Sequence, residues 1–196
     1  MSTSISSSIS IYDASVPALI RMLQNLGHIL RKGEAFARRT GIRPESLLER
    51  RLQPDMFSLA HQVVIVVSGA KGSAARLAGR LDAKDTSPEL QVFNRGDEAS
   101  FGRRPTSFGE LQTLIEEAVV YLKTFSRDAM DAGPESITVA KPGEARVFEA
   151  RAFLLDYVLP NLYFHISIAY ALLRSAGVDL GKGDFEGTPA YRVETV

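Results

Sequence analysis

The segment EARAFLLDYVLPNLYFHISIAYALLRSAG, residues 149–177, is the most informative part of the chain for its architecture. Its apolar residues recur at steps of three and four, which predicts a long amphipathic helix whose buried stripe includes Leu154, Val158, Ile168 and Leu172. Pro160 removes a backbone donor inside the segment, so we expect a kink there. Gly177 is the type of residue at which such a helix ends.

A first helix is predicted upstream, over residues 16–40. Its apolar stripe consists of Leu19, Met22, Leu23, Leu26, Ile29 and Leu30. We expect Ser15 to cap the first turn and Gly41 to end the helix. A short helical turn should follow within residues 42–52.

Residues 56–79 predict a second long helix, although the run VVIVV at 63–67 is equally typical of a buried strand. The flanking sequence favours the helix. His61 lies on one helical stripe with Phe57 and Val64, and the continuation AARLAG at 74–79 is rich in helix-forming residues. We therefore expect a buried helix with a face of small residues.

A third long helix is predicted from a capping box at Ser107 and Glu110 to about residue 125. Before it, residues 80–106 form a long polar connection, and we expect a loop over 83–106 that is a candidate lid. After it, residues 137–139 and 146–148 flank a Lys-Pro-Gly-Glu turn, which predicts a small β-hairpin.

These elements together predict an all-α protein, an up-down four-helix bundle with long connections and a small β-hairpin before the last helix. We expect a single domain over residues 13–187. A mobile Ser-rich tail is expected at 1–12 and a C-terminal tail at 188–196.

Composition narrows the classes of function. The 196 residues contain 23 Lys plus Arg, 23 Asp plus Glu and no Cys. A net charge of zero argues against nucleic acid as a partner, and the absence of Cys excludes disulfides, thiolate metal sites and Cys nucleophiles. Unbroken apolar runs such as 63–67 are too short to cross a membrane, and the opening MSTSISSSIS lacks the basic residues typical of a targeting segment. We therefore expect a cytoplasmic protein without a nucleic-acid or membrane partner.

Three polar side chains are predicted to face the interior of the bundle. His61 lies on the inner stripe of the second helix, and Asn161 and His165 lie one turn apart on the inner face of the last. His28, in contrast, should face solvent. Helical bundles build metal sites from such groups, but spacing alone favours buried His residues that simply hydrogen-bond and pack.

Several separated blocks resemble the DUF1993 family, a branch of the DinB-like four-helix bundles. The last helix LPNLYFHISIAYALLRSAG at 159–177 and the following LGKGDFEG at 180–187 are similar to its signature. The stretches IYDASVPALIRML at 11–23, RLQPDMFSLAHQV at 51–63 and SFGELQ at 107–112 match it as well. The polar stretch 83–106 is longer than the family usually has.

The resemblance implies a divalent metal, often nickel or zinc. Its ligands would be one His on the second helix and a His-x-x-x-His pair on the last. His61 matches the first, and His165 matches the later member of the pair, because Arg174 and Gly177 follow it at the expected distances. Asn161 stands where the earlier His is expected. An amide oxygen is a weaker ligand than imidazole, so metal would be held loosely by His61, His165 and Asn161, or would be absent.

The resemblance thus favours an enzyme that acts on a small organic molecule, of hydrolase, transferase or isomerase type. Its pocket would be built from His61, Asn161 and His165, with His61 and His165 as catalytic groups and Tyr157 and Ser68 as further pocket residues. The alternative is a metal-free module without catalysis that binds a small molecule or forms a homodimer. A homodimer is expected in either case.

Overall fold

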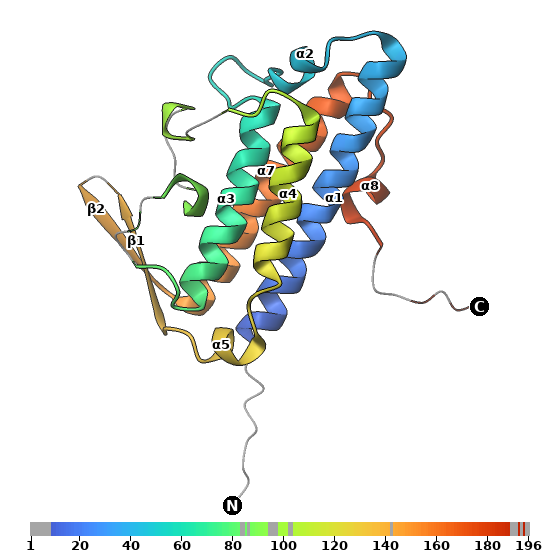
Figure 1. The fold of residues 1–196 in the computed structure, drawn as a ribbon. Helices are drawn as coiled ribbons and strands as arrows, with labels where there is room; N and C mark the ends of the chain where they lie inside the picture. The colour runs from blue at the N-terminus through green and yellow to red at the C-terminus, as the bar shows by residue number, and fades with distance from the viewer. Residues whose placement is uncertain are drawn as a thin grey trace, which may run out of the picture.

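A computed structural model describes residues 9–82, 85, 87–93, 98–101, 104–141, 143–188, 192 and 194. Four long helices form a bundle (Figure 1), and they are α1 (Ile11–Thr40), α3 (Leu59–Leu77), α4 (Phe108–Leu122) and α7 (Leu159–Ser175). The predicted all-α bundle is confirmed, and so is the hairpin before the last long helix.

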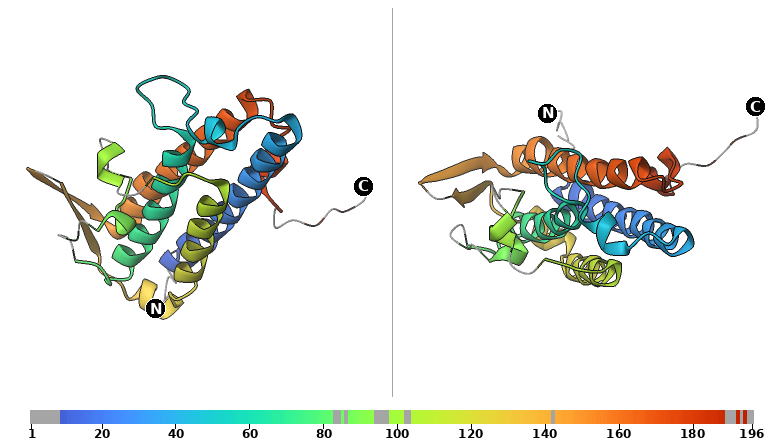
Figure 2. Two further views of the ribbon diagram at one scale, coloured as in Figure 1. Left: turned by 45° about the horizontal axis from the view of Figure 1, so that its top comes forward. Right: turned by 90° about the horizontal axis from the view of Figure 1, so that it is seen from above.

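The long connection between α3 and α4 determines the relative directions of the four helices. Helix α1 packs on α4, α3 packs on both α4 and α7, and α7 returns to α1. Helices α1 and α7 run in one direction and α3 and α4 in the other (Figures 1 and 2). Neighbouring α3 and α4 are therefore parallel, because the connection between them carries the chain back to the starting end of α3.

Helix α3 is the central element of the core. Every residue from Leu59 to Leu77 is buried except Val64 and Lys71. This burial explains the ambiguous VVIVV run, since a helix that is covered on all sides needs no polar face. The predicted stripe of α1 is also confirmed, and Leu19, Leu23, Leu26, Ile29 and Leu30 are all 0% exposed.

Helix α1 begins at Ile11, five residues earlier than expected. Ser10 caps it by accepting a hydrogen bond from the backbone N–H of Asp13 at 3.1 Å. The expectation that Ser15 caps the helix is wrong, because Ser15 lies inside α1 and its hydroxyl donates to the carbonyl of Ile11. Gly41 ends the helix with φ 72°, as predicted.

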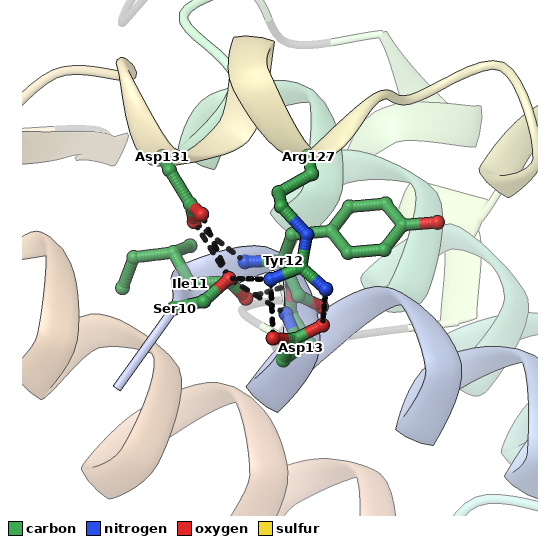
Figure 3. Close-up of polar contacts among 7 residues, drawn as sticks. Ser10, Ile11, Tyr12, Asp13, Arg127 and Asp131 are labelled. Carbon is green, nitrogen blue, oxygen red and sulfur yellow. Dashed lines mark hydrogen bonds and ion pairs between the residues drawn. The ribbon is translucent and has the colours of Figure 1, made fainter. Parts of the chain in front are cut away.

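The early start depends on α5 (Arg127–Asp131), a short helix that follows α4. The Asp131 carboxylate accepts hydrogen bonds from Ser10 Oγ at 2.8 Å and from the Tyr12 backbone at 3.1 Å (Figure 3). Arg127 pairs with Asp13, which lies in the first turn of α1. A carboxylate at a helix N-terminus stabilises its free N–H groups, so contacts made more than 100 residues along the chain decide where α1 starts.

The hairpin consists of β1 (Ser136–Lys141) and β2 (Glu144–Glu149), paired antiparallel. It leads through α6 (Ala150–Ala152) into a π-helical turn, η3 (Phe153–Val158), and then into α7. The irregularity predicted at Pro160 thus takes the form of a π turn just before it. Pro160 itself lies in the first turn of α7, where a missing N–H costs little.

Two short helices flank the bundle, α2 (Pro44–Leu48) and α8 (Lys182–Glu186). Asp184 fastens α8 to α1, since its carboxylate lies 2.9 Å from Lys32 Nζ and 2.7 Å from His28 Nε2. The backbone N–H of Gly181 also donates to Asp184, and this hydrogen bond, together with the Lys32 and His28 contacts, lowers the Asp184 pKa to about 2. His28 is half exposed, as predicted, and has a structural contact.

Residues 150–175 form one helical stretch that is long and apolar enough to cross a membrane by length and composition. The run at 63–67 considered above is shorter and belongs to α3. In the bundle, the inner side of α7 packs against α3 and α1, and it buries Leu162, Ile166 and Leu173.

Candidate functional site

His61 lies in the first turn of α3 and is only 3% exposed. Its Nδ1 lies 2.9 Å from the hydroxyl of Ser58, the residue just before the helix. Glu98, from the 3₁₀ turn η2 (Glu98–Phe101), places a carboxylate oxygen 3.6 Å from the same nitrogen. Arg51 lies 2.5 Å from that oxygen, so the carboxylate is shared between an imidazole and a guanidinium.

These surroundings keep His61 neutral and Glu98 ionised. Burial lowers the pKa of His61, and the positive charges of Arg104 and Arg51 lower it further. The Glu98 carboxylate raises this pKa, but its effect is smaller than the other three together. Burial opposes ionisation of Glu98, but the Arg51 hydrogen bond and the neighbouring cationic charge bring its pKa below the usual value. A neutral imidazole beside a carboxylate is able to accept a proton, because the carboxylate stabilises the cation that forms.

His165 faces α3 from the middle of α7 and is 9% exposed. Its Nδ1 lies 2.7 Å from Oε1 of Gln62, the residue that follows His61. Gln62 thus contacts His165 through its side chain and is a neighbour of His61 only along the chain. Burial lowers the pKa of His165 to about 4, so this ring is uncharged at neutral pH.

Aromatic rings enclose His165. The Phe93 ring stacks on the imidazole with an interplanar angle of 7° and a centroid distance of 6.0 Å. Phe164 meets it edge-on at 5.2 Å. Phe93 has φ 35°, and its ring lies where a Cβ at Gly69 would approach to 2.4 Å. Only glycine at position 69 allows this ring to rest on α3.

Phe93 and Glu98 come from the long connection between α3 and α4, which lies beside α3 (Figure 1). We call its described residues 87–93 and 98–101 the strap. Arg76 donates to the Leu90 carbonyl at 2.8 Å, and that oxygen would lie 1.9 Å from a Cβ at Gly72. Val92 is 0% exposed. The described strap is thus packed onto α3, whereas residues 83–84, 86, 94–97 and 102–103 of the predicted lid lie outside the described residues.

The remaining predicted pocket residues make separate contacts. The Asn161 amide donates to the Tyr157 carbonyl at 2.7 Å, and among the described residues it makes no hydrogen bond to either imidazole. The Ser68 hydroxyl donates to the Val64 carbonyl in its own helix at 2.9 Å. The Tyr157 hydroxyl reaches the Val92 carbonyl at 3.4 Å, which joins it to the strap. Their roles as pocket residues stay predictions.

Sequence patterns could point to only part of this site. Ser58 and Gln62 flank His61 in a segment that is otherwise apolar, and a Gln in a buried helix is a signal of a specific hydrogen bond. Phe93 and Glu98 carry no comparable signal, because the strap has no periodic pattern. Packing alone brings them to the two imidazoles.

The implied metal was compared with the donor groups present. In the parts of the chain that the structure describes, no three His, Cys, Asp or Glu side chains gather in a way that could hold a metal ion. The carboxylate nearest to His61 is already paired with Arg51, whose charge opposes a bound cation. The donors present therefore do not fit the complete three-residue set, and we derive no chemical step through a metal.

Known proteins with a similar sequence and a similar fold support the assignment of the bundle. Residues 11–186 match the domain of unknown function DUF1993. The chain belongs to the DUF1993 family. This DUF1993 protein is similar to a DinB family member protein from Shewanella denitrificans, whose crystal structure shares 33% identity and has a TM-score of 0.75. The similarity covers 93% of this chain and 95% of the other. No curated protein matches the chain.

Proposed function

We propose that this DUF1993 protein is an enzyme that moves a proton on a small organic molecule, with His61 as the general base and His165 as a neutral group that orients the substrate. The observation that carries the proposal is the buried imidazole of His61 with the Glu98 carboxylate beside it. A second buried imidazole, His165, meets the same helix at Gln62, the next residue along the chain. Hydrolysis, group transfer and isomerisation all include such a proton transfer.

The two imidazoles differ in a way that suits different roles. His61 has a carboxylate 3.6 Å from Nδ1, which stabilises the ring once it takes up a proton at Nε2. His165 has no described carboxylate at its ring, and its pKa of about 4 keeps it uncharged. A group that stays neutral positions a substrate by hydrogen bonding, while its neighbour accepts the proton.

The test is a screen of small substrates that represent hydrolysis, thiol transfer and isomerisation, followed by comparison of variants. We expect His61→Gln to lower kcat by about 10²- to 10⁴-fold, the usual effect of removing a general base. His28→Gln is the matched control, because His28 lies on the outer side of α1 and should leave the rate unchanged. His61→Gln and His165→Gln variants that both match His28→Gln in rate would refute the proposal.

The metal predicted from the resemblance is tested separately. Elemental analysis of untagged protein compares wild type with a variant in which His61 and His165 are both replaced by Ala. Stoichiometric nickel or zinc in wild type, and none in the variant, would assign the two imidazoles as ligands. If wild-type protein remains metal-free after incubation with each ion, the predicted metal site is refuted and the metal-free proton transfer is the mechanism that remains.

A further inference from the structure

The side-chain amide of Gln62 has one defined orientation. Gln62 is 2% exposed, and its Nε2 donates to the Phe57 carbonyl at 3.2 Å while its Oε1 faces His165. Turning the amide by 180° would place Oε1 against the Phe57 carbonyl oxygen, and two acceptors repel each other. The Phe57 carbonyl therefore determines which end of the amide His165 meets.

This orientation determines where the proton of His165 lies. An amide oxygen can only accept a hydrogen bond, so the contact of 2.7 Å requires the proton on Nδ1. A neutral imidazole carries one ring proton, and the surroundings of His165 favour the neutral form, since the ring is 9% exposed, lies between Phe93 and Phe164, and has no described carboxylate beside it. Its Nε2 is consequently an acceptor with a free lone pair.

The Nε2 edge of the ring is the part left for a ligand. One face of the imidazole is stacked against Phe93, and Phe164 meets the ring edge-on. Nε2 has no hydrogen-bond partner among the described residues, yet it is not one of their fully buried unpaired atoms. This nitrogen is therefore not completely buried.

We infer that Gln62 is a positioning residue that holds His165 in the Nδ1–H form, so that the site selects molecules that donate a hydrogen bond to Nε2. Alcohols and primary or secondary amides meet this requirement, whereas esters and ketones without an O–H or N–H do not. This inference rests on the proposed function only in taking the Nε2 edge of His165 as the place where a small molecule binds.

The first test observes the tautomer directly, by ¹⁵N NMR of protein labelled at His. Wild-type His165 should show a protonated Nδ1 and an unprotonated Nε2. Gln62→Met removes the acceptor, and the Nε2–H form should become populated. Gln62→Glu keeps an acceptor oxygen and should keep Nδ1 protonated, while its carboxylate also favours the doubly protonated ring as the pH falls. Thermal unfolding of each variant confirms that it is folded.

Ser58→Ala is the matched control, because Ser58 contacts His61 and not His165. It should leave the His165 resonances unchanged. An Nε2–H form of His165 in the wild type, or a Gln62→Met spectrum identical to wild type, would overturn the inference. Neither result depends on turnover, so failure of the proposed catalytic role of His61 is seen separately.

The second test addresses the ligand class with two probes of nearly the same shape. Acetamide carries N–H donors and acetone carries none. Titration with acetamide should shift the ¹⁵N resonance of His165 Nε2, and acetone should leave it in place. Equal shifts with both probes, or no shift with acetamide, would overturn the selection for hydrogen-bond donors.

Discussion

His165 should make the protein less stable in mild acid. Its pKa is 6.5 when unfolded and about 4 when buried in the bundle. Above pH 6.5 both states are neutral at this ring, so it contributes nothing to the pH dependence. Below pH 6.5 His165 binds a proton in the unfolded state but not in the folded state, and acidification therefore favours unfolding.

The size of the effect follows from the difference between the two pKa values. With about 1.36 kcal/mol for each pKa unit, His165 should cost about 2 kcal/mol of unfolding free energy by pH 5 and about 3 kcal/mol by pH 4. The loss should level off below the folded pKa of about 4, because both states are then protonated at this ring. This is a large part of the total stability of a typical domain, about 5–15 kcal/mol.

Urea unfolding at several pH values between 7 and 4, with a chelator present, measures this slope. His165→Gln and His165→Leu form a matched pair of variants, since neither side chain titrates although one is polar and the other apolar. In both variants the unfolding free energy should lack the pH dependence that His165 contributes, whatever its value at pH 7. Other ionisable groups titrate in all three proteins and cancel in the comparison. A wild-type slope equal to that of the variants would refute the reasoning.

Three further predictions concern the strap and the helix ends. Gly72→Ala places a Cβ 1.9 Å from the Leu90 carbonyl oxygen and should cost about 1–3 kcal/mol, with faster amide exchange in residues 87–93; unchanged exchange would contradict the strap contact. Asp184→Asn removes the partner of Lys32 and should make α8 more sensitive to trypsin, whereas equal cleavage rates would show that the contact does not hold α8. Ser107→Ala removes a side-chain cap and should lower the unfolding free energy by about 1 kcal/mol in urea, and an unchanged midpoint would be inconsistent with capping.

Local patterns predicted the elements that depend on neighbouring residues. The stripe of α1, the start of α4 at Ser107 and the hairpin of β1 and β2 all follow from residues within a few positions of one another. The start of α1 was missed because it depends on Asp131, which is distant in sequence. The kink was assigned to Pro160 because a local pattern does not reveal the π turn before it.

The candidate site divides in the same way. His61 and His165 were found because they are polar residues on apolar helical faces, and both are buried as expected. Glu98 and Phe93 could not be found, because their positions depend on how a non-periodic strap packs against Gly69 and Gly72. Their contribution to the site requires tertiary contacts that no spacing rule describes.

The sequence by itself determined the helical periodicity, the ends of several elements, the absence of thiol chemistry and the family to which the chain belongs. These are properties of residue type and local spacing. Only the tertiary structure decided which nitrogen of His165 is free, since that depends on an amide in α3 oriented by the Phe57 carbonyl. Hydrogen bonds are short and directional, so the chemical state of a buried ring is determined by the few atoms that folding places around it.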